Sequence, residues 1–288
     1  MFDILIYGVL RGAIFAMAAF GFSLVLGVLE IVNIAHGVYI ILGGFFAFWL
    51  TGSIGLPLPL AILLAALLTG VIAALLQKIF IGRVFRTNPL MVLVQTFGLA
   101  IVLTQILEKT FGASERFIRF DIPKYPVVEF AGVLIPTNEA VVFGIALVTT
   151  LALLLLLNFT DFGRALRACR DNAKSAAILG INVNSIYMKT MFICGLWTGL
   201  AGALLIGIQP LAPYMYMHWT IDAFLIVIIG GLSSIPGVLI AGFLYGVVNY
   251  TAYYYLSTLA PAVIYGTLVV VLLCRPQGLF GLGMVNRK

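Results

Sequence analysis

Long apolar runs dominate the hydrophobic pattern of this chain, and most are close to the length that crosses a bilayer as a helix. A spanning helix needs about 20 apolar residues. The runs predict membrane helices over 4–29, 37–52, 57–77, 89–107, 139–158 and 187–208, followed by a glycine-interrupted region over 222–256 and a short last run at 261–274. The chain is therefore predicted to be an all-α, polytopic helical membrane protein with about eight or nine crossing segments, including a glycine-broken or re-entrant element near 222–237.

Composition supports a single transmembrane domain over 1–288. The chain is 63% hydrophobic and 9% charged, whereas soluble proteins have roughly 25% charged residues. So little polar surface cannot cover a soluble fold. A β-barrel would alternate apolar and polar residues in segments of about ten, and no such alternation is visible. The start, MFDILIYGVL, lacks the basic region of a cleavable signal peptide.

The basic residues predict which connections face the cytoplasm, because cytoplasmic loops of membrane proteins carry an excess of Lys and Arg. Ten of the sixteen fall in two connections and the C-terminus: Lys78, Arg83, Arg86, Arg164, Arg167, Arg170, Lys174, Arg275, Arg287 and Lys288. The net charge of +6 therefore marks cytoplasmic loops and indicates no nucleic-acid partner. The 108–138 connection has balanced charge and three prolines, which predicts an ordered external loop. Counting crossings back from these cytoplasmic segments places the N-terminus outside. The same count requires an odd number of crossings after residue 209, which is met either by three short crossings or by one crossing plus a re-entrant element.

A glycine-rich stretch, IIGGLSSIPGVLIAG at 228–242, is where a regular helix is hardest to maintain. One interpretation is a simple turn between two helices. The other is a discontinuous helix beside a translocation path, because broken backbone at membrane depth survives where it is buried or lines a cavity. The second makes Gly230, Gly231, Ser233 and Ser234 candidate path residues.

Small residues four apart predict close helix packing in lipid. Three glycine pairs have this spacing: Gly8 and Gly12, Gly195 and Gly199, and Gly242 and Gly246. We interpret them as packing seams, one of which could join subunits. Tyr214, Tyr216 and Trp219 cluster in a connection expected outside, where they indicate an interfacial aromatic belt or, alternatively, a solute-facing group.

The apolar runs contain almost no ionisable group. No Asp, Glu, Lys, Arg or His occurs in 37–52, 57–77, 89–107, 140–157, 190–208 or 223–274. Charge-coupled carriers usually keep an intramembrane ionisable residue, so transport here is either passive or driven from outside the path. A membrane enzyme would need a nucleophile with a base, a carboxylate pair or a metal. Three scattered cysteines, with no CxxC, indicate neither a metal site nor a disulfide framework, and we expect no catalytic residue.

Glu30, Asn33 and His36 have helical i, i+3, i+6 spacing at the end of the first run. One interpretation is a polar hinge whose side chains cap the next helix. The other makes Asn33 and His36 part of the translocation path. A metal site is not expected, because Asn is a poor ligand and no second His lies near.

A short basic segment between two apolar runs, 163–181, has the signals of an amphipathic helix. Asp161 is the expected N-cap and Gly180 the expected stop. Leu166, Cys169, Ala173, Ala176 and Ala177 form an apolar stripe of small side chains, and Arg164, Arg167, Asp171 and Lys174 form a polar one. Such a helix suits a cleft in another protein or, alternatively, anionic lipid headgroups.

Four blocks of sequence carry a resemblance to a known family. They are NIAHG at 33–37 with Gly43 and Gly44, GRALRACRD at 163–171 continuing to Gly180-Ile181-Asn182, Gly230–Gly237, and RPQGLFG at 275–281. Together they resemble the LivH-like permease subunits of bacterial ABC importers of the branched-chain amino acid type. The blocks follow the family order and span nearly the whole chain.

The resemblance implies a multi-pass protein of the bacterial inner membrane with a cytoplasmic C-terminus. It implies that 159–185 is a coupling segment that docks on an ATPase subunit. Its expected coupling residues are Gly163, Arg164, Arg167, Arg170, Asp171, Lys174 and Gly180. The implied partners are a second related permease (or a second copy), two nucleotide-binding ATPase subunits and a periplasmic solute-binding protein. ATP and Mg would bind those ATPases, and this chain would bind no cofactor and is not itself an enzyme.

The substrate implied first is a hydrophobic amino acid. Urea or short-amide importers share the same blocks, and a stand-alone channel or ion-coupled carrier for a neutral solute is the alternative from a different class. One departure concerns the glycine block. Relatives often have Gly-Gly-x-Gly-Ser where this chain has Gly230-Gly231-Leu232-Ser233-Ser234, which puts the backbone shape there in question.

Overall fold

The computed structural model describes residues 2–84, 89–120, 127–130, 132–232, 234–275 and 277–280. The long helices are α1 (Phe2–Leu29), α2 (His36–Gly52), α3 (Leu58–Leu76), α5 (Pro89–Phe111), α6 (Thr137–Phe159), α7 (Asp161–Ile178), α8 (Val183–Leu205), α9 (Tyr216–Gly230), α10 (Ile235–Leu256) and α11 (Ala260–Cys274). The polytopic helical architecture predicted from the apolar runs is confirmed. One antiparallel hairpin, β1 (Val127–Phe130) and β2 (Val133–Pro136), was not expected from the pattern.

Within the described residues, six helical stretches are long and apolar enough to cross a membrane. The longest single helix, α1, has 28 residues and a length of about 42 Å. The helix expected to end at residue 77 instead continues through a π-helical turn, Gln77–Ile81, and α4 (Gly82–Val84), so Lys78 and Arg83 lie on helix rather than in a loop. Because α2, α9 and α11 are only 15 to 17 residues long, the expected eight or nine complete crossings are not established.

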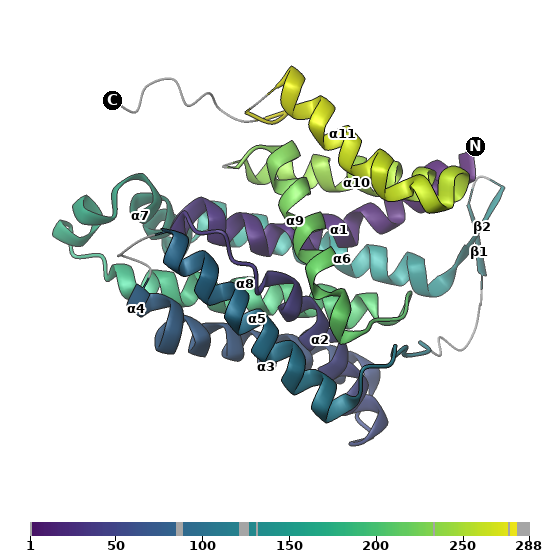
Figure 1. Ribbon diagram of the computed structural model, residues 1–288, viewed down its shortest axis with the longest axis horizontal. Coiled ribbons are helices and arrows are strands. Elements are labelled where there is room, and N and C mark those ends of the chain that lie inside the picture. The colour runs from purple at the N-terminus through teal and green to yellow at the C-terminus, as the bar shows by residue number, and fades with distance from the viewer. Residues whose placement is uncertain are drawn as a thin grey trace.

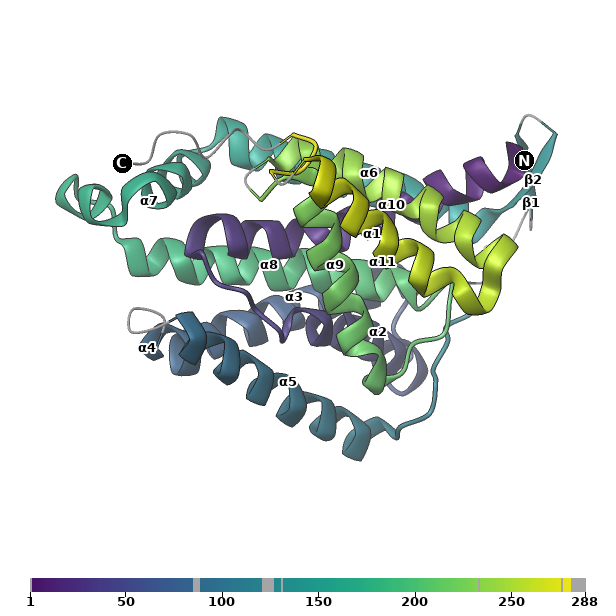
Figure 2. The ribbon, with the colours of Figure 1, turned by 45° about the horizontal axis from the view of Figure 1, so that its top comes forward.

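Most helices run along the longest axis of the molecule, and the connections gather at its two ends (Figure 1). The α4 turn and α7 lie at one end, which we call the α7 end. The start of α1 and the β1–β2 hairpin lie at the opposite end, which we call the hairpin end (Figures 1 and 2). The strongly basic connections around α4 and α7 are therefore separated from the charge-balanced 108–138 connection by the full length of the helices.

Glycines allow α1 and α10 to pack in direct backbone contact. A Cβ added at Gly12 would lie 2.8 Å from the Phe243 Cα, and one added at Gly242 would lie 2.5 Å from the Ala16 Cα. Gly246 in turn rests on the backbone of Gly12. Two of the three predicted glycine seams therefore face each other within one chain, where close backbone approach replaces side-chain packing.

The third glycine pair lies on α8, which packs against both α2 and α3. A Cβ at Gly195 would lie 2.5 Å from the Ala73 Cβ, and one at Gly199 would lie 2.6 Å from the Thr69 Cβ. On the α2 side, Gly43 rests against the backbone of Gly199. All three seams are thus used inside the subunit, and α8 is held between two helices.

At the hairpin end, backbone hydrogen bonds tie the 112–120 segment to the connection between α8 and α9. Arg116 and Leu211 exchange both backbone bonds, at 2.8 and 2.9 Å, and the Ile118 N–H bonds the Ile206 carbonyl at 3.0 Å. The Tyr214 hydroxyl bonds Glu115 at 3.1 Å. This part of the predicted external loop is ordered, while Pro123 and Pro126 lie outside the described residues.

Candidate functional site

The connection between α1 and α2 is a buried, non-helical stretch, residues 30–35. Glu30 has a left-handed backbone (φ 56°) that ends α1, and Ile31, Asn33 and Ala35 are at most 4% exposed. His36, the first residue of α2, places its Nε2 3.0 Å from the carbonyl oxygen of Ala18, a residue in the middle of α1. The chain therefore turns back along α1 before α2 begins (Figure 2).

Side chains from other helices satisfy the backbone of this buried stretch. The Ile34 N–H donates to Thr96 Oγ1 of α5 at 3.2 Å, and the Gly37 N–H donates to Thr220 Oγ1 of α9 at 2.9 Å. The Thr220 hydroxyl also contacts the Ile34 carbonyl at 3.1 Å. Asn33 Oδ1 accepts the Ala35 N–H at 3.1 Å. Non-helical backbone away from water needs such partners, and neither threonine had been singled out from the sequence.

Asn33 and His36, the first two candidate path residues, are thus 1% and 0% exposed. Asn33 Oδ1 accepts the Ala35 N–H within the turn, but Ala35, the N-cap residue of α2, has no side-chain cap hydrogen bond, so the expected capping of the next helix is not seen. Asn33 Nδ2 has no hydrogen-bond partner among the described residues. His36 also packs edge-on against Phe22, with ring centroids 5.1 Å apart. His36 therefore links α2 to α1, whereas the Asn33 hydrogen bond stays within the turn.

The predicted glycine break lies between α9 and α10 and is narrower than expected. Gly230 ends α9, Gly231 has a backbone (φ 97°) that favours glycine, and the Ser234 hydroxyl caps α10 by accepting the Gly237 N–H at 3.1 Å. Ser233 lies outside the described residues. The two helices leave this break in clearly different directions (Figures 1 and 2), so a single straight helix over 222–256 is excluded.

The segment after α11 packs onto this break. The Leu279 N–H donates to the Ile229 carbonyl at 2.7 Å, which satisfies one of the carbonyls that the end of α9 leaves free. Gly278 (φ 80°) is buried there, and a Cβ on it would lie 2.5 Å from the Ile228 oxygen. Two separate sequence blocks, the glycine break and the C-terminal motif, thus form one structural unit. Pro276 and Gly281 of that motif lie outside the described residues.

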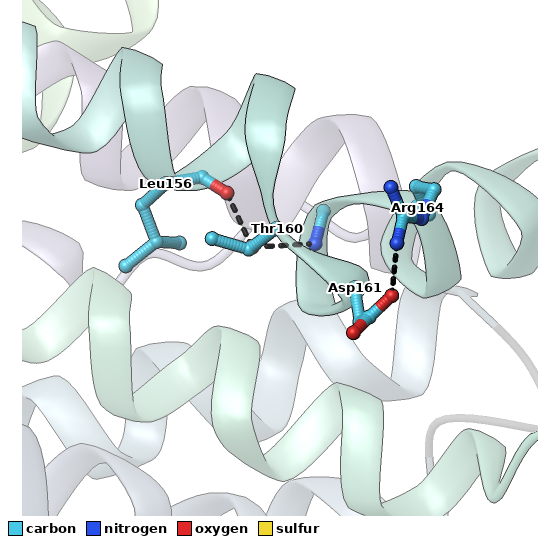
Figure 3. Close-up of polar contacts among 5 residues, drawn as sticks. Leu156, Thr160, Asp161 and Arg164 are labelled. Carbon is cyan, nitrogen blue, oxygen red and sulfur yellow. Dashed lines mark hydrogen bonds and ion pairs between the residues drawn. The ribbon is translucent and has the colours of Figure 1, made fainter.

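The corner between α6 and α7 is built by Thr160, which replaces Asp161 as the N-cap. Its Oγ1 accepts the Gly163 N–H at 3.3 Å and bonds the Leu156 carbonyl (Figure 3). Asp161 instead begins the helix and pairs with Arg164 on the exposed side (Figure 3). The prediction of Asp161 as N-cap was therefore wrong by one residue, because Thr160 has the extended backbone that a cap requires.

Gly163 and Arg167 close this corner from the α7 side. The position of a Cβ on Gly163 is already occupied by the Leu157 carbonyl, and Arg167 Nη1 donates to the same carbonyl at 2.6 Å. A cationic donor at a helix C-terminus also matches the helix dipole. These two residues of the predicted coupling segment therefore fix the direction in which α7 leaves α6.

The apolar face of α7 is buried against its own chain, which corrects the expectation that it seats in another protein. Leu166, Cys169 and Ala176 are 5%, 3% and 2% exposed, and α7 packs on α6, α8 and α1. Burial raises the pKa of the Cys169 thiol. Of the predicted apolar stripe, only Ala177 is exposed and Ala173 is half-buried.

The outer surface of α7 consists of polar side chains and a short apolar tip. Asn172 has non-helical backbone and divides the helix, and its side chain caps the second part by accepting the Ser175 N–H at 3.0 Å. Ile178 and Leu179 at the tip are 86% and 79% exposed. Gly180 (φ 86°) ends the helix as predicted, with the paired terminal hydrogen bonds of a Schellman motif.

The remaining predicted coupling residues differ in exposure. Asp171 and Lys174 are exposed together with Arg164, whereas Arg170 is half-buried. The polar stripe therefore faces away from the membrane helices. Arg167 differs from the others because it donates a hydrogen bond to the Leu157 carbonyl at the α6–α7 corner.

Charged side chains occur in or directly beside some of the apolar runs. Arg11 of α1 pairs with Glu139 of α6 at 3.2 Å and lies over the Tyr250 ring. Asp222 of α9 is 2% exposed, one position before the stretch 223–274. Trp219, expected in an interfacial belt, is 4% exposed and also lies inside the protein.

Within the described residues no group of three or more His, Cys, Asp or Glu side chains could hold a metal ion. The architecture is that of an integral membrane protein, with six helical stretches among the described residues long and apolar enough to cross a bilayer.

Comparison with known proteins identifies the family. Residues 4–273 match the model for the permease component of branched-chain amino acid transport systems, and the chain belongs to this family. It is 28% identical to the high-affinity branched-chain amino acid transport permease LivH of Salmonella typhimurium, over 95% of this chain and 93% of the relative. It is 30% identical to BraD of Pseudomonas aeruginosa, over 96% and 94%. No solved structure matches the chain.

Proposed function

We propose that this chain is the membrane permease subunit of an ATP-driven importer for hydrophobic, branched-chain-type amino acids. The observation that carries the proposal is the family match over residues 4–273, because it covers the membrane helices and both ends of the fold. The complex would contain a second permease subunit, two ATPase subunits that bind ATP and Mg, and a periplasmic solute-binding protein.

In this proposal the α7 end faces the cytoplasm and the hairpin end faces the periplasm. The basic elements α4, which carries Arg83, and α7, which carries Lys174, lie at the α7 end (Figure 1), which fits the positive-inside rule. The ATPase would dock on the outer surface of α7, which combines Asp171 and Lys174 with the apolar tip Ile178–Leu179. The capped corner at Gly163 and Arg167 would transmit the ATPase movement to α6, because a rigid connection is needed to carry a force.

The proposal is tested by reconstituting the whole complex in proteoliposomes and measuring leucine uptake with and without ATP. We expect uptake only with ATP, with intact ATPase subunits and with loaded binding protein. Leucine flux from this chain alone would establish a stand-alone channel or carrier instead. Uptake of urea or acetamide, with no uptake of leucine, would assign the chain to the short-amide branch.

A further inference from the structure

A buried carboxylate sits in the second turn of α9, a helix that crosses the middle of the molecule (Figures 1 and 2). Asp222 is 2% exposed, and its neighbours on the helix, Ala223, Leu225 and Ile226, are buried and apolar. Ionisable residues inside a membrane protein are costly and usually mark a functional site. The family match describes transport and assigns no role to this residue.

The two oxygens of this carboxylate have different surroundings. Oδ1 accepts a hydrogen bond of 2.6 Å from the Tyr245 hydroxyl of α10. Oδ2 has no hydrogen-bond partner among the described residues, although His218 Nε2 lies 3.4 Å away, one helical turn nearer the start of α9. The carboxylate is therefore held firmly on one side and left incompletely paired on the other.

Aromatic rings lie beside the residue that holds the carboxylate. Phe15 meets Tyr245 edge-on at 5.0 Å and stacks on Trp219, three positions before Asp222 on α9, at 5.6 Å. Aromatic faces attract cations, and apolar surroundings strengthen a charge interaction. Carboxylate and rings together suit a positively charged group better than a neutral or anionic one.

His218 controls access to the free oxygen. Its side chain is 46% exposed, whereas that of Asp222 is 3% exposed, so the imidazole forms the boundary between the carboxylate and the exterior. A rotation of His218 toward solvent would leave Oδ2 open on the side that the imidazole now covers. A primary ammonium with three donors could then bind there.

We propose that Asp222, oriented by Tyr245 and covered by His218, receives the ammonium group of the amino acid as it passes through the permease. The proposal rests on the proposed function and deepens it, because it gives the substrate a defined polar contact. It also replaces the expectation of a path without charged groups. The opposite face of α9 carries Thr220, which binds the α1–α2 connection. Binding at Asp222 would therefore affect a helix that contacts both the α1–α2 connection and the break between α9 and α10.

The test compares Asp222→Asn with Glu108→Gln in the complete reconstituted importer. Glu108 is half-buried in the last turn of α5, where its carboxylate accepts a hydrogen bond from Gln105, and serves as a control for losing a carboxylate elsewhere in the chain. We expect leucine uptake by Asp222→Asn to fall about 10- to 100-fold, as for loss of a charged hydrogen bond, with ATP consumed per leucine rising. Glu108→Gln should behave as wild type, and uptake by wild type separately tests the proposed function.

His218→Gln distinguishes a binding site from a structural ion pair. If His218 competes with the ammonium for Oδ2, its removal should raise uptake at low leucine by about 2- to 5-fold, the usual range for a weak ion pair. Asp222→Asn and His218→Gln would then act in opposite directions. Equal losses in both variants, with a lowered melting temperature, would overturn the proposal in favour of a structural pair, and so would normal uptake by Asp222→Asn.

Discussion

Gly8 of α1 lies so close to Val247 of α10 that a Cβ on Gly8 would come within 2.6 Å of the Val247 Cα. The same seam continues through Gly12 and Gly242 along the length of the two helices. Lipid offers no hydrophobic driving force for helix association, so close backbone packing supplies much of the attraction. The first and tenth helices are therefore the central pair of the fold.

A larger side chain in this seam should separate the two helices. We expect Gly8→Leu to destabilise the protein by about 1–3 kcal/mol, the usual cost of overpacking, because Val247 backbone cannot move aside as a side chain could. Gly98→Leu in α5 is the matched control, since nothing lies within 4 Å of a Cβ there. Thermal unfolding in detergent measures both. Equal melting temperatures for the two variants would show that the seam does not hold the helices.

Arg167 and Arg164 should differ in importance although they lie one turn apart in the basic segment. Arg167 satisfies the Leu157 carbonyl at the end of α6, whereas Arg164 pairs with Asp161 on the exposed surface. We expect Arg167→Met to reduce ATP-driven uptake at least several-fold and Arg164→Met to change it little, because exposed ion pairs contribute little. Uptake by the reconstituted complex, normalised to the amount of assembled protein, is the measurement. A larger effect at Arg164 would contradict the corner model.

The exposed tip of α7 should be needed for assembly rather than for folding. We expect Ile178→Ser combined with Leu179→Ser to leave the melting temperature of the isolated subunit unchanged, because both side chains are more than three-quarters exposed. Co-purification of the ATPase subunits should fall by tenfold or more if these side chains are central to the contact. Full retention of the ATPases by the double variant would move the docking surface elsewhere on the chain.

Much of the fold could be predicted from patterns among residues that are close together in the sequence. Apolar run length located the helices, and Gly180 ended α7 where the sequence predicted. The three glycine pairs were recognised as seams from their spacing alone. Their partners could not be assigned, because any small-residue face can pack against any other until the three-dimensional arrangement is known.

The candidate site was harder to predict because it depends on contacts between distant segments. Thr96 and Thr220 satisfy the α1–α2 connection from 62 and 186 residues away in sequence, and an isolated threonine in an apolar run carries no signal of that role. Asp222 stands at the edge of an apolar run, where a sequence gives no means of telling a buried carboxylate from a loop residue. Its i, i+4 spacing from His218 was the available clue.

Cysteine labelling should establish the orientation. Cys274 is exposed, and Ser114, an exposed residue of the 112–120 segment, can be replaced by Cys in a variant that lacks Cys274. A membrane-impermeant maleimide added from the periplasmic side should label the Ser114→Cys variant, and added to inverted vesicles it should label Cys274. The buried Cys169 should react slowly in both, since its raised pKa leaves little reactive thiolate near neutral pH. The reverse labelling pattern would place the α7 end outside.

The C-terminal segment should stabilise the break between α9 and α10. An alanine at position 278 meets two penalties: the left-handed backbone (φ 80°) costs about 1–2 kcal/mol, and its Cβ would lie 2.5 Å from the Ile228 oxygen. Gly55→Ala is the matched control, because Gly55 has a similar φ of 74° with nothing within 4 Å. We expect Gly278→Ala to release the Leu279 N–H from the Ile229 carbonyl, so hydrogen exchange at Leu279 should accelerate at least tenfold while Gly55→Ala leaves it unchanged. Because the released segment no longer satisfies the end of α9, amino acid uptake should fall in the same variant. Faster exchange with unaltered uptake would mean that the segment covers the break without taking part in transport.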